Sequence, residues 1–320
     1  MDALISNLTS PIVLAYILGI LVRLAKSDLE IPKPIYQGIS IYLLLAIGLK
    51  GGVELSKTPF AEISGPLLVT LIMGVITPIL AFAVLRYIGR MDIINASAIA
   101  AHYGSVSAVT FIAAISYTQA QGLEPEGFMP TLLALLEVPG IMVALLIPHF
   151  MSKGSQVSLK KAVHEVATGG SIVLLTGGLV IGFLAGPEKF VSIEPFFVGG
   201  FQGALVIFLL ELGMVTASRL GDLRKAGWFL VAFGIVMPII FGTMAVIAGS
   251  WAGLSIAGTT VFAAMVSSGS YIAAPAAVRI ALPKASPALY LTAALGITFP
   301  FNIALGIPLY LYISQWFASF

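Results

Sequence analysis

The feature that most constrains this chain is a succession of apolar stretches, each about as long as a membrane is thick. A helix that crosses the roughly 30 Å hydrocarbon layer needs about 20 mostly apolar residues. Ten stretches approach that length, at 4–24, 35–49, 63–85, 93–117, 128–150, 169–184, 196–217, 226–248, 256–282 and 287–313. The sequence therefore predicts an all-α membrane protein with ten transmembrane helices.

The composition excludes several other classes of protein. Hydrophobic residues make up 59% of the chain and charged residues only 9%, whereas about a quarter of a soluble domain is charged. A soluble enzyme or a nucleic-acid-binding protein would lack polar surface, and the absence of cysteine excludes a disulfide-stapled domain. The formal net charge of +2 identifies no partner.

Basic residues are divided unevenly between the two sides of the predicted bundle. One side receives Lys50, Lys57 and Lys189, and the other receives the rest of the 16 Lys and Arg residues. Cytoplasmic loops carry the excess of basic residues. We therefore expect both termini outside a bacterial inner membrane.

Short sequence matches divide the ten segments into two halves. At one offset, 44–48 matches 209–213, Gly104-Ser105 matches Gly269-Ser270, and Glu137 falls on Asn302. Five segments per half is an odd number, so the second half is inverted relative to the first. We expect a first repeat at 1–150, a cytoplasmic linker at 151–168 and a second repeat at 169–320; such inverted repeats are typical of secondary transporters.

Clusters of Gly, Ser and Pro interrupt the fourth and ninth segments, at 102–110 and 266–275. Non-helical backbone at membrane depth is tolerated only in protein or beside a cavity, so these interruptions predict a site. If the two helices cross there, their half-helix N-termini suit a small anion, and carbonyl and hydroxyl oxygens suit Na⁺. The alternative is that the small residues only allow close packing, which is our interpretation of Gly178, Gly182 and Gly186 on the sixth segment.

Two carboxylates fall well inside predicted spans, where they are costly and often functional. Glu137 lies beside the interrupted fourth segment and is a candidate Na⁺ ligand or proton carrier. Its repeat mate Asn302 is an oxygen ligand or a packing residue. Glu211 is a cation ligand, a protonated hydrogen-bonding group, or a partner for Lys50 if Lys50 folds inward instead of reaching the headgroups.

Three further hydroxyl groups and one histidine lie close to the interruptions in the sequence. Ser107, Thr110 and Ser267 complete the candidate sodium ligands, whereas His102 is a proton-sensitive gate or a hydrogen-bonded packing residue. The only other histidines are His149 and His164, and we find no metal-ligand cluster or nucleophile with a base. We therefore expect no enzyme and no cofactor, with Na⁺ as a coupling ion.

Over nearly its whole length the chain resembles the sodium-dependent bicarbonate transporter family, the SbtA-type permeases. The resemblance rests on 104–107, on Glu137-Val138-Pro139, on 213–225 with Gly213-Met214 and Ser218-Arg219, and on the Ser-rich interruption that continues to Pro275 and Arg279. It implies crossed fourth and ninth helices, a moving substrate-carrying core, a homotrimer and Na⁺-driven bicarbonate uptake.

The resemblance also implies roles for single residues. Gly104, Ser105, Val106 and Ser107 would meet the anion, opposite Ser268, Gly269 and Ser270, and Glu137 would take the acidic position of the sodium site. Tyr271 stands where we expect an Asp, which removes a sodium ligand or narrows the pocket. A PII-like regulatory protein is a candidate partner, although the linker is shorter than the long one associated with this family.

Other functions remain open at this stage. A related cation–proton antiporter would use Glu137 as its proton carrier, and a transporter-like membrane sensor would signal through its basic loops. The sequence does not separate bicarbonate from formate, acetate or a larger carboxylate.

Overall fold

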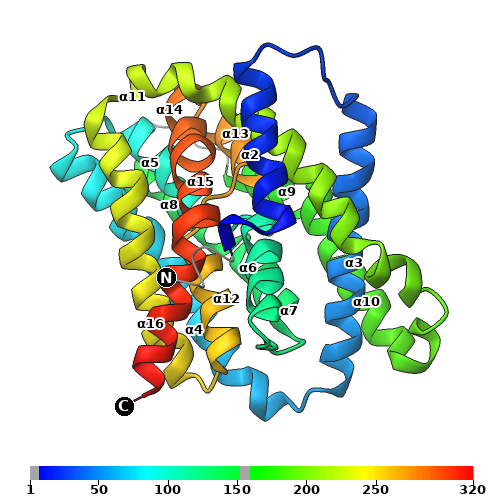
Figure 1. The fold of residues 1–320 in the computed structure, drawn as a ribbon. Coiled ribbons are helices and arrows are strands. Elements are labelled where there is room, and N and C mark those ends of the chain that lie inside the picture. The colour runs from blue at the N-terminus through cyan, green and yellow to red at the C-terminus, as the bar shows by residue number, and fades with distance from the viewer. Residues whose placement is uncertain (1–6, 152–158, 320) are drawn as a thin grey trace.

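The computed structural model describes residues 7–151 and 159–319, and within these ranges every regular element is helical (Figure 1). Part of the predicted linker, 152–158, and the start of the first predicted segment lie outside the described residues. The first half contains α2 (Pro11–Leu24), α3 (Lys33–Lys57), α4 (Phe60–Ala83), η1 (Val84–Ile88), α5 (Ile93–Tyr103), α6 (Ala108–Ala120), α7 (Met129–Leu136) and α8 (Pro139–Met151).

The second half begins with a short helix from the predicted linker. Its elements are α9 (Leu159–Ala167), α10 (Gly170–Phe190), η2 (Pro195–Gly199), α11 (Phe201–Trp251), α12 (Ile256–Val266), α13 (Ala273–Ala281), α14 (Pro287–Leu291), η3 (Thr292–Thr298), α15 (Phe299–Phe301), η4 (Asn302–Gly306) and α16 (Ile307–Ala318). The label η marks π-helical turns, which interrupt the last segment near Pro300. Proline explains such irregular turns because it cannot donate a backbone hydrogen bond.

Eight helical stretches of the described chain are long and apolar enough to cross a membrane. They coincide with eight of the ten predicted segments, and the other two predictions correspond to the shorter apolar helices α2 and α12. The stretch α12 is short because an interruption separates it from α13. The prediction of an all-helical membrane protein is thus confirmed, whereas the number of ten crossings stays a prediction.

Two glycines with positive φ angles interrupt the long helices α10 and α11. Within α11, Gly227 has φ +75° and divides the seventh predicted segment from the eighth. Within α10, Gly186 has φ +66°, and no other group lies near the position of its missing Cβ atom. Our packing interpretation of Gly186 is therefore wrong, because this glycine supplies a left-handed backbone conformation.

The packing interpretation is confirmed for Gly178 and Gly182. A Cβ atom on Gly182 would lie 2.1 Å from the Leu49 carbonyl oxygen, and one on Gly178 would lie 2.9 Å from the Gly48 Cα atom. Helices α3 and α10 therefore touch backbone to backbone, and they lie side by side in Figure 1. Small residues permit this approach between membrane helices.

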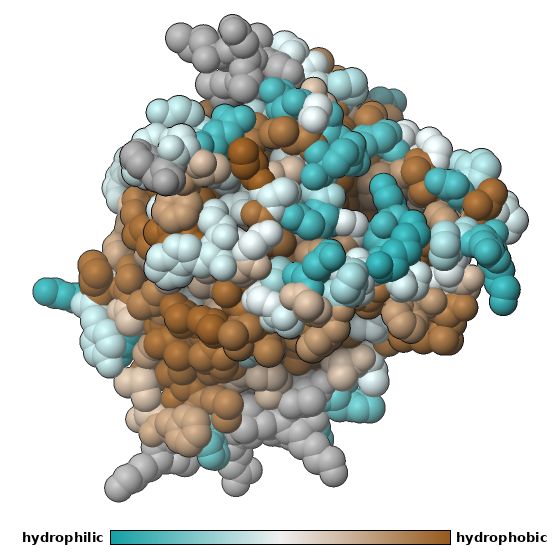
Figure 2. All heavy atoms as spheres, turned by 90° about the horizontal axis from the view of Figure 1, so that it is seen from below, coloured by the Kyte–Doolittle hydropathy of each residue, from teal (hydrophilic) through white to brown (hydrophobic). Residues whose placement is uncertain are grey.

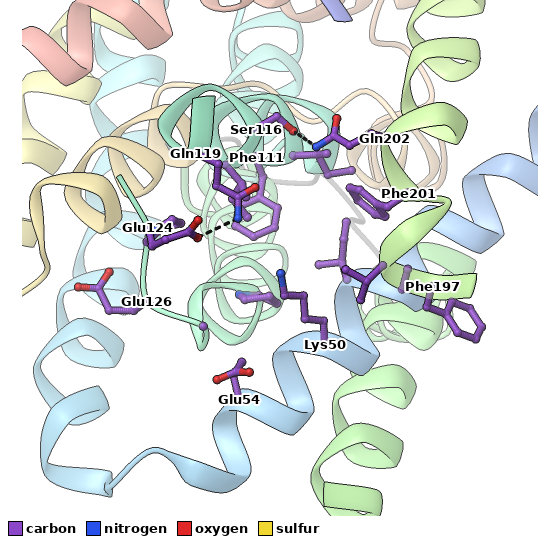
Figure 3. Close-up of a pocket in the computed structure, with 18 residues that line it drawn as sticks. Lys50, Glu54, Phe111, Ser116, Gln119, Glu124, Glu126, Phe197, Phe201 and Gln202 are labelled. Carbon is purple, nitrogen blue, oxygen red and sulfur yellow. Dashed lines mark hydrogen bonds between the residues drawn. The ribbon is translucent and has the colours of Figure 1, made fainter. Parts of the chain in front are cut away.

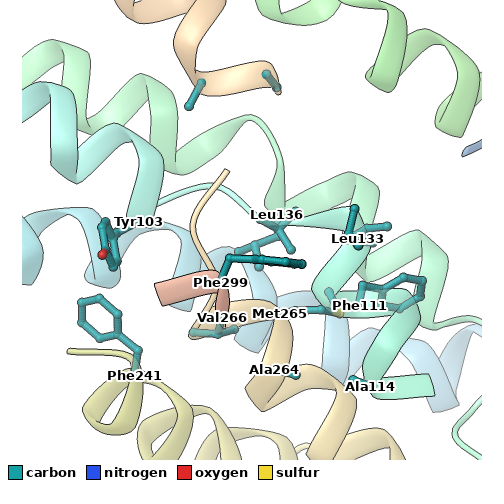
Figure 4. Close-up of a cluster of buried hydrophobic side chains, with 14 of the residues drawn as sticks. Tyr103, Phe111, Ala114, Leu133, Leu136, Phe241, Ala264, Met265, Val266 and Phe299 are labelled. Carbon is teal, nitrogen blue, oxygen red and sulfur yellow. The ribbon is translucent and has the colours of Figure 1, made fainter. Parts of the chain in front are cut away.

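The interrupted span formed by α5 and α6 is the most buried of the eight candidate spans. In an 18-residue apolar stretch of this span 89% of the residues are buried, against 28% for α10. Tyr103, Phe111, Leu133, Met265 and Phe299 meet around it, each at most 2% exposed (Figure 4). These residues come from α5, α6, α7, α12 and α15, so the two interrupted helices lie at the centre of the protein.

The outer helices expose apolar side chains, as contact with lipid requires. On α4, Leu68, Ile72 and Ile79 are 60%, 44% and 46% exposed, and Leu184 of α10 is 75% exposed. Seen from the end that carries the turn between α3 and α4, polar side chains gather in the upper part of the view, and a broad apolar area lies below and to their left (Figure 2). Trp228, Trp251 and Trp316 are all exposed, as side chains at a membrane interface would be.

The α3–α10 contact provides a test of this packing. We expect Gly182→Ala to destabilise the protein by about 1–3 kcal/mol, the usual cost of overpacking, because its new methyl group would collide with a backbone carbonyl. Gly177→Ala is the matched control on the same helix, since no group lies within 4 Å of its missing Cβ atom. Thermal unfolding in detergent would measure both variants, and equal melting temperatures would contradict the backbone contact.

Candidate functional site

The first interruption separates α5 from α6 at 104–107. Ser107 occupies the N-cap of α6, where its Oγ atom accepts a hydrogen bond from the Thr110 N–H at 3.1 Å. Serine favours this position because its short side chain satisfies one of the free N–H groups of a new helix. The amide groups of Ala108 and Val109 have no partner within the helix.

The second interruption separates α12 from α13 at 267–272. The Ser270 Oγ atom accepts a hydrogen bond from the Ala274 N–H at 3.3 Å and thereby satisfies a free N–H group in the first turn of α13. Both interruptions lie where the clusters of Gly, Ser and Pro predict them.

Hydrogen bonds join the two interruptions directly. The Ser107 N–H donates to Ser268 Oγ at 2.8 Å, and the Ser270 N–H donates to the His102 carbonyl oxygen at 2.8 Å. The Ser107 hydroxyl also donates to the Tyr271 hydroxyl at 3.2 Å. Ser107, Ser268 and Ser270 are at most 3% exposed, so each interruption supplies buried partners for the other.

Glu137 lies at the junction of α7 and α8 and is 8% exposed. Its carboxylate accepts hydrogen bonds from the Ser105 hydroxyl at 3.3 Å and from the Val106 N–H. The carboxylate therefore stands beside the first interruption, as its neighbourhood in the sequence suggests. Hydrogen bonds of this kind partly compensate a carboxylate for the loss of water.

A small cavity lies at this meeting point and has a volume of about 20 Å³. Val106, Ser107, Glu137 and Tyr271 line it, together with Leu44, Ala108, Leu133, Ser171, Ile172, Leu175 and Ile272. A cavity of this size holds about one water molecule. The cavity therefore has room for a single small ion but not for a carboxylate ligand.

Gly104 and Gly269, the two predicted glycines of the site, do not line this cavity but allow neighbouring elements to approach closely. A Cβ atom on Gly104 would lie 2.8 Å from the Pro78 side chain, and one on Gly140 would lie 1.8 Å from the Gly104 carbonyl oxygen. A Cβ atom on Gly269 would meet Ala294 at 3.0 Å. Both glycines bring backbones of neighbouring elements together.

Asn302 and Ser267 form a separate polar cluster. The Asn302 side-chain amide donates to the Ser267 carbonyl oxygen at 3.1 Å, and its own oxygen accepts from the Tyr310 hydroxyl at 2.9 Å. These bonds correspond to the packing alternative for Asn302. Thr110 differs, because its fully buried Oγ1 atom has no hydrogen-bond partner in the described part of the chain.

The other ionisable candidates lie elsewhere. His102 is fully buried, its Nδ1 atom lies 2.7 Å from the Ala98 carbonyl oxygen, and its ring stacks on Tyr290, which agrees with the packing interpretation. Glu211 is half-buried and interacts electrostatically with Glu30. Lys50 lies within α3 beside a different cavity, so no Lys50–Glu211 pair forms.

Sequence reasoning missed the side chains that other helices bring to the site. Leu44 of α3 and Ser171 and Leu175 of α10 close the small cavity from the far side, and Tyr310 holds Asn302. A lone serine or leucine in an apolar helix carries no signal that distinguishes it from its neighbours. Among the described residues, no group of three or more His, Asp or Glu side chains could hold a metal ion.

The hydrogen bond between the two interruptions provides a stability test. We expect Ser268→Ala to lower the free energy of unfolding by about 1–3 kcal/mol, because the buried Ser107 N–H loses its acceptor. Thr260→Val is the matched control, since the buried Thr260 hydroxyl donates to the Ile256 carbonyl oxygen of its own helix. Thermal unfolding would compare them, and a Ser268→Ala variant as stable as the control would refute the assigned role.

The sequence profile of the Na⁺-dependent bicarbonate transporter superfamily matches residues 11–315. No curated protein matches the chain. Because the profile covers nearly the whole sequence, the chain belongs to this superfamily. The protein is therefore an integral membrane transporter and not an enzyme, and the family requires no cofactor besides the coupling ion.

Proposed function

We propose that this member of the superfamily is a Na⁺-coupled symporter that imports a small monovalent anion, with bicarbonate as the first candidate. The observation that carries the proposal is the pair of Gly/Ser interruptions that hydrogen-bond to each other beside a cavity containing one carboxylate and no Lys or Arg side chain. Such a site binds an anion through backbone and hydroxyl groups and a cation through oxygen atoms.

The proposed anion site comprises Gly104, Ser105, Val106, Ser107, Ser268, Gly269, Ser270 and Tyr271. Its principal donors are the free N–H groups at the start of α6 and the hydroxyls of Ser105 and Ser107. In this structure the Ser268 hydroxyl accepts the hydrogen bond from the Ser107 N–H, and the Tyr271 hydroxyl accepts the one from the Ser107 hydroxyl. Anion binding would replace these internal bonds, so the cavity would widen as the two interruptions separate.

The proposed sodium site centres on Glu137, with Ser107, Thr110, Ser267 and Asn302 as further oxygen ligands. A buried carboxylate needs a compensating charge, and none of the side chains that line its cavity carries a positive charge. The unpartnered Thr110 hydroxyl is available as a neutral ligand. The Ser267 carbonyl oxygen would have to give up its hydrogen bond from the Asn302 amide, and the Asn302 oxygen its hydrogen bond from Tyr310, before either oxygen could bind the ion.

The proposed architecture is ten crossings in two inverted repeats, at 1–150 and 169–320, joined by the linker 151–168. Two features support it. The half-helices α5 and α12 have 11 residues each, and the repeat-related glycines Gly48 and Gly213 make equivalent contacts, the first with α10 and the second with α2.

Location and assembly rest on sequence alone. The distribution of basic residues supports a bacterial inner membrane with both termini outside. The family resemblance alone supports a homotrimer and a PII-like regulatory protein.

The decisive experiment is uptake of labelled bicarbonate by proteoliposomes under an inward Na⁺ gradient, with pH clamped and formate and acetate as competitors. The proposal requires saturable uptake that depends on Na⁺. Uptake of another anion would keep the mechanism and change the substrate. Na⁺-driven alkalinisation without an anion requirement would instead indicate an antiporter, and binding without flux would indicate a sensor.

Removing either hydroxyl of the first interruption should weaken anion uptake. We expect Ser105→Ala and Ser107→Ala each to raise the KM for the anion about tenfold, since a hydrogen bond to a charged group is worth about 1.5–3 kcal/mol. The control is Ser64→Ala, whose exposed hydroxyl bonds only the Ala61 carbonyl oxygen. Unchanged kinetics in both variants of the interruption, with protein of normal stability, would exclude this anion site.

Removing the charge of Glu137 should weaken sodium dependence. We expect Glu137→Gln to raise the half-saturating Na⁺ concentration at least about tenfold, because the amide keeps the shape but loses the charge that attracts the ion. Glu62→Gln, at the exposed start of α4, is the control. Uptake measured over a Na⁺ series would test this, and wild-type Na⁺ affinity in Glu137→Gln would remove Glu137 from the sodium site.

A further inference from the structure

A second and much larger cavity lies between α3, α6, the segment 124–127 and the start of α11 (Figure 3). Its volume is about 510 Å³, and it shares no lining residue with the small cavity at the interruptions. This volume falls within the roughly 300–1,000 Å³ of small-molecule sites. Nothing in the proposed transport mechanism uses this space.

The carboxylates around this cavity already have partners. Glu54 forms an ion pair with Lys57 at 3.0 Å, and Glu124 accepts a hydrogen bond from the Gln119 amide at 2.9 Å. Glu126 accepts a hydrogen bond from the Ser255 N–H at 2.6 Å, at the N-cap of α12, where the helix dipole favours a negative charge. Each of these three groups thus has a partner, although the buried Oε2 atom of Glu126 accepts no hydrogen bond from the described residues.

Lys50 is different, because it forms no hydrogen bond or ion pair with any other residue that the structure describes. Figure 3 shows its side chain pointing into the cavity, away from the Glu54 carboxylate. The hydroxyl of Ser116, elsewhere in the lining, accepts a hydrogen bond from the Gln202 amide at 3.0 Å, and its own hydrogen remains free to donate. The cavity therefore contains one free ammonium group with a hydroxyl donor also in its lining.

The rest of the lining is largely apolar and aromatic. Phe111, Phe197 and Phe201 line the cavity, and Ile47, Ile112 and Ile115 add aliphatic surface. Aromatic rings favour other rings at stacked or edge-on geometry, and apolar walls strengthen the attraction between an ammonium group and a carboxylate. Inorganic anions such as bicarbonate would share the attraction to the ammonium group but would gain nothing from the aromatic rings.

We propose that this cavity is a binding site for an aromatic monocarboxylate. The carboxylate would pair with Lys50, and the ring would lie against Phe111 and Phe201. An occupant of this cavity would separate α6 from α3 and the start of α11, so it would oppose any movement that brings these helices together.

Calorimetric titration of the purified full-length protein with benzoate tests this site without any measurement of transport. We expect saturable binding of benzoate and none of benzamide, which has the same shape but no charge. Lys50→Gln should weaken benzoate binding at least about tenfold, and Lys50→Arg should retain it. Because the readout is binding, the result is independent of whether bicarbonate is the transported anion.

The matched control is Lys33→Gln, at the exposed start of the same helix and outside the lining of the cavity. This variant should bind benzoate within about twofold of the wild type, which separates a local contact from a general effect of net charge. Equal affinity of Lys50→Gln and the wild type would overturn the proposal. The absence of saturable binding to the wild-type protein, or heat that benzamide reproduces, would overturn it as well.

Discussion

Unpaired backbone groups in the middle of a membrane are the constraint on which the rest of this structure depends. Lipid offers no hydrogen-bond partners, so each interruption of a helix must be satisfied by protein. Here the Ser107 N–H finds its acceptor on Ser268, and the Ser270 N–H finds its acceptor on His102. Because each interruption completes the other, the two segments are held together at the most buried place in the chain.

Glycine residues allow the backbones of neighbouring helices to touch. Gly48 and Gly182 bring α3 against α10, and Gly19 and Gly213 bring α2 against α11. Without a hydrophobic effect between helices in lipid, such contacts depend on van der Waals packing, which small residues maximise. The interrupted helices then occupy the interior, and the apolar faces of α4 and α10 are left for lipid.

The two cavities differ in a way that matters for function. The small cavity is bordered by groups that hydrogen-bond to one another, and it contains the Glu137 carboxylate without a cationic side chain. A bound cation would supply the positive charge that this buried carboxylate lacks. The large one is lined by aromatic rings and by Lys50, an exposed residue without an ionic partner in the described part of the chain. Two side chains of opposite charge without an ionic partner among the described residues thus underlie the two sites that we propose.

Much of the candidate site could be predicted from the sequence, because helix interruptions and buried carboxylates leave strong local signals. The Ser-rich clusters identified both interruptions, and Glu137 proved to contact the first of them. Residues that reach the site from other helices, such as Ser171 and Tyr310, could not be predicted, since a single polar side chain in an apolar helix has no periodic signature. The role of Gly186 was misjudged for a related reason, because spacing does not report a backbone dihedral angle.

By itself, the sequence determined that this chain is helical, lies in a membrane and breaks two of its spans, because hydrophobic length and helix-breaking residues act locally. Only the tertiary structure decided which polar groups satisfy each other. The hydroxyl of Ser268 is an acceptor for Ser107 and the oxygen of Asn302 is occupied by Tyr310, although their residue types suit ion ligands equally well. Hydrogen bonding depends on distance and direction, and these are set only when the helices pack.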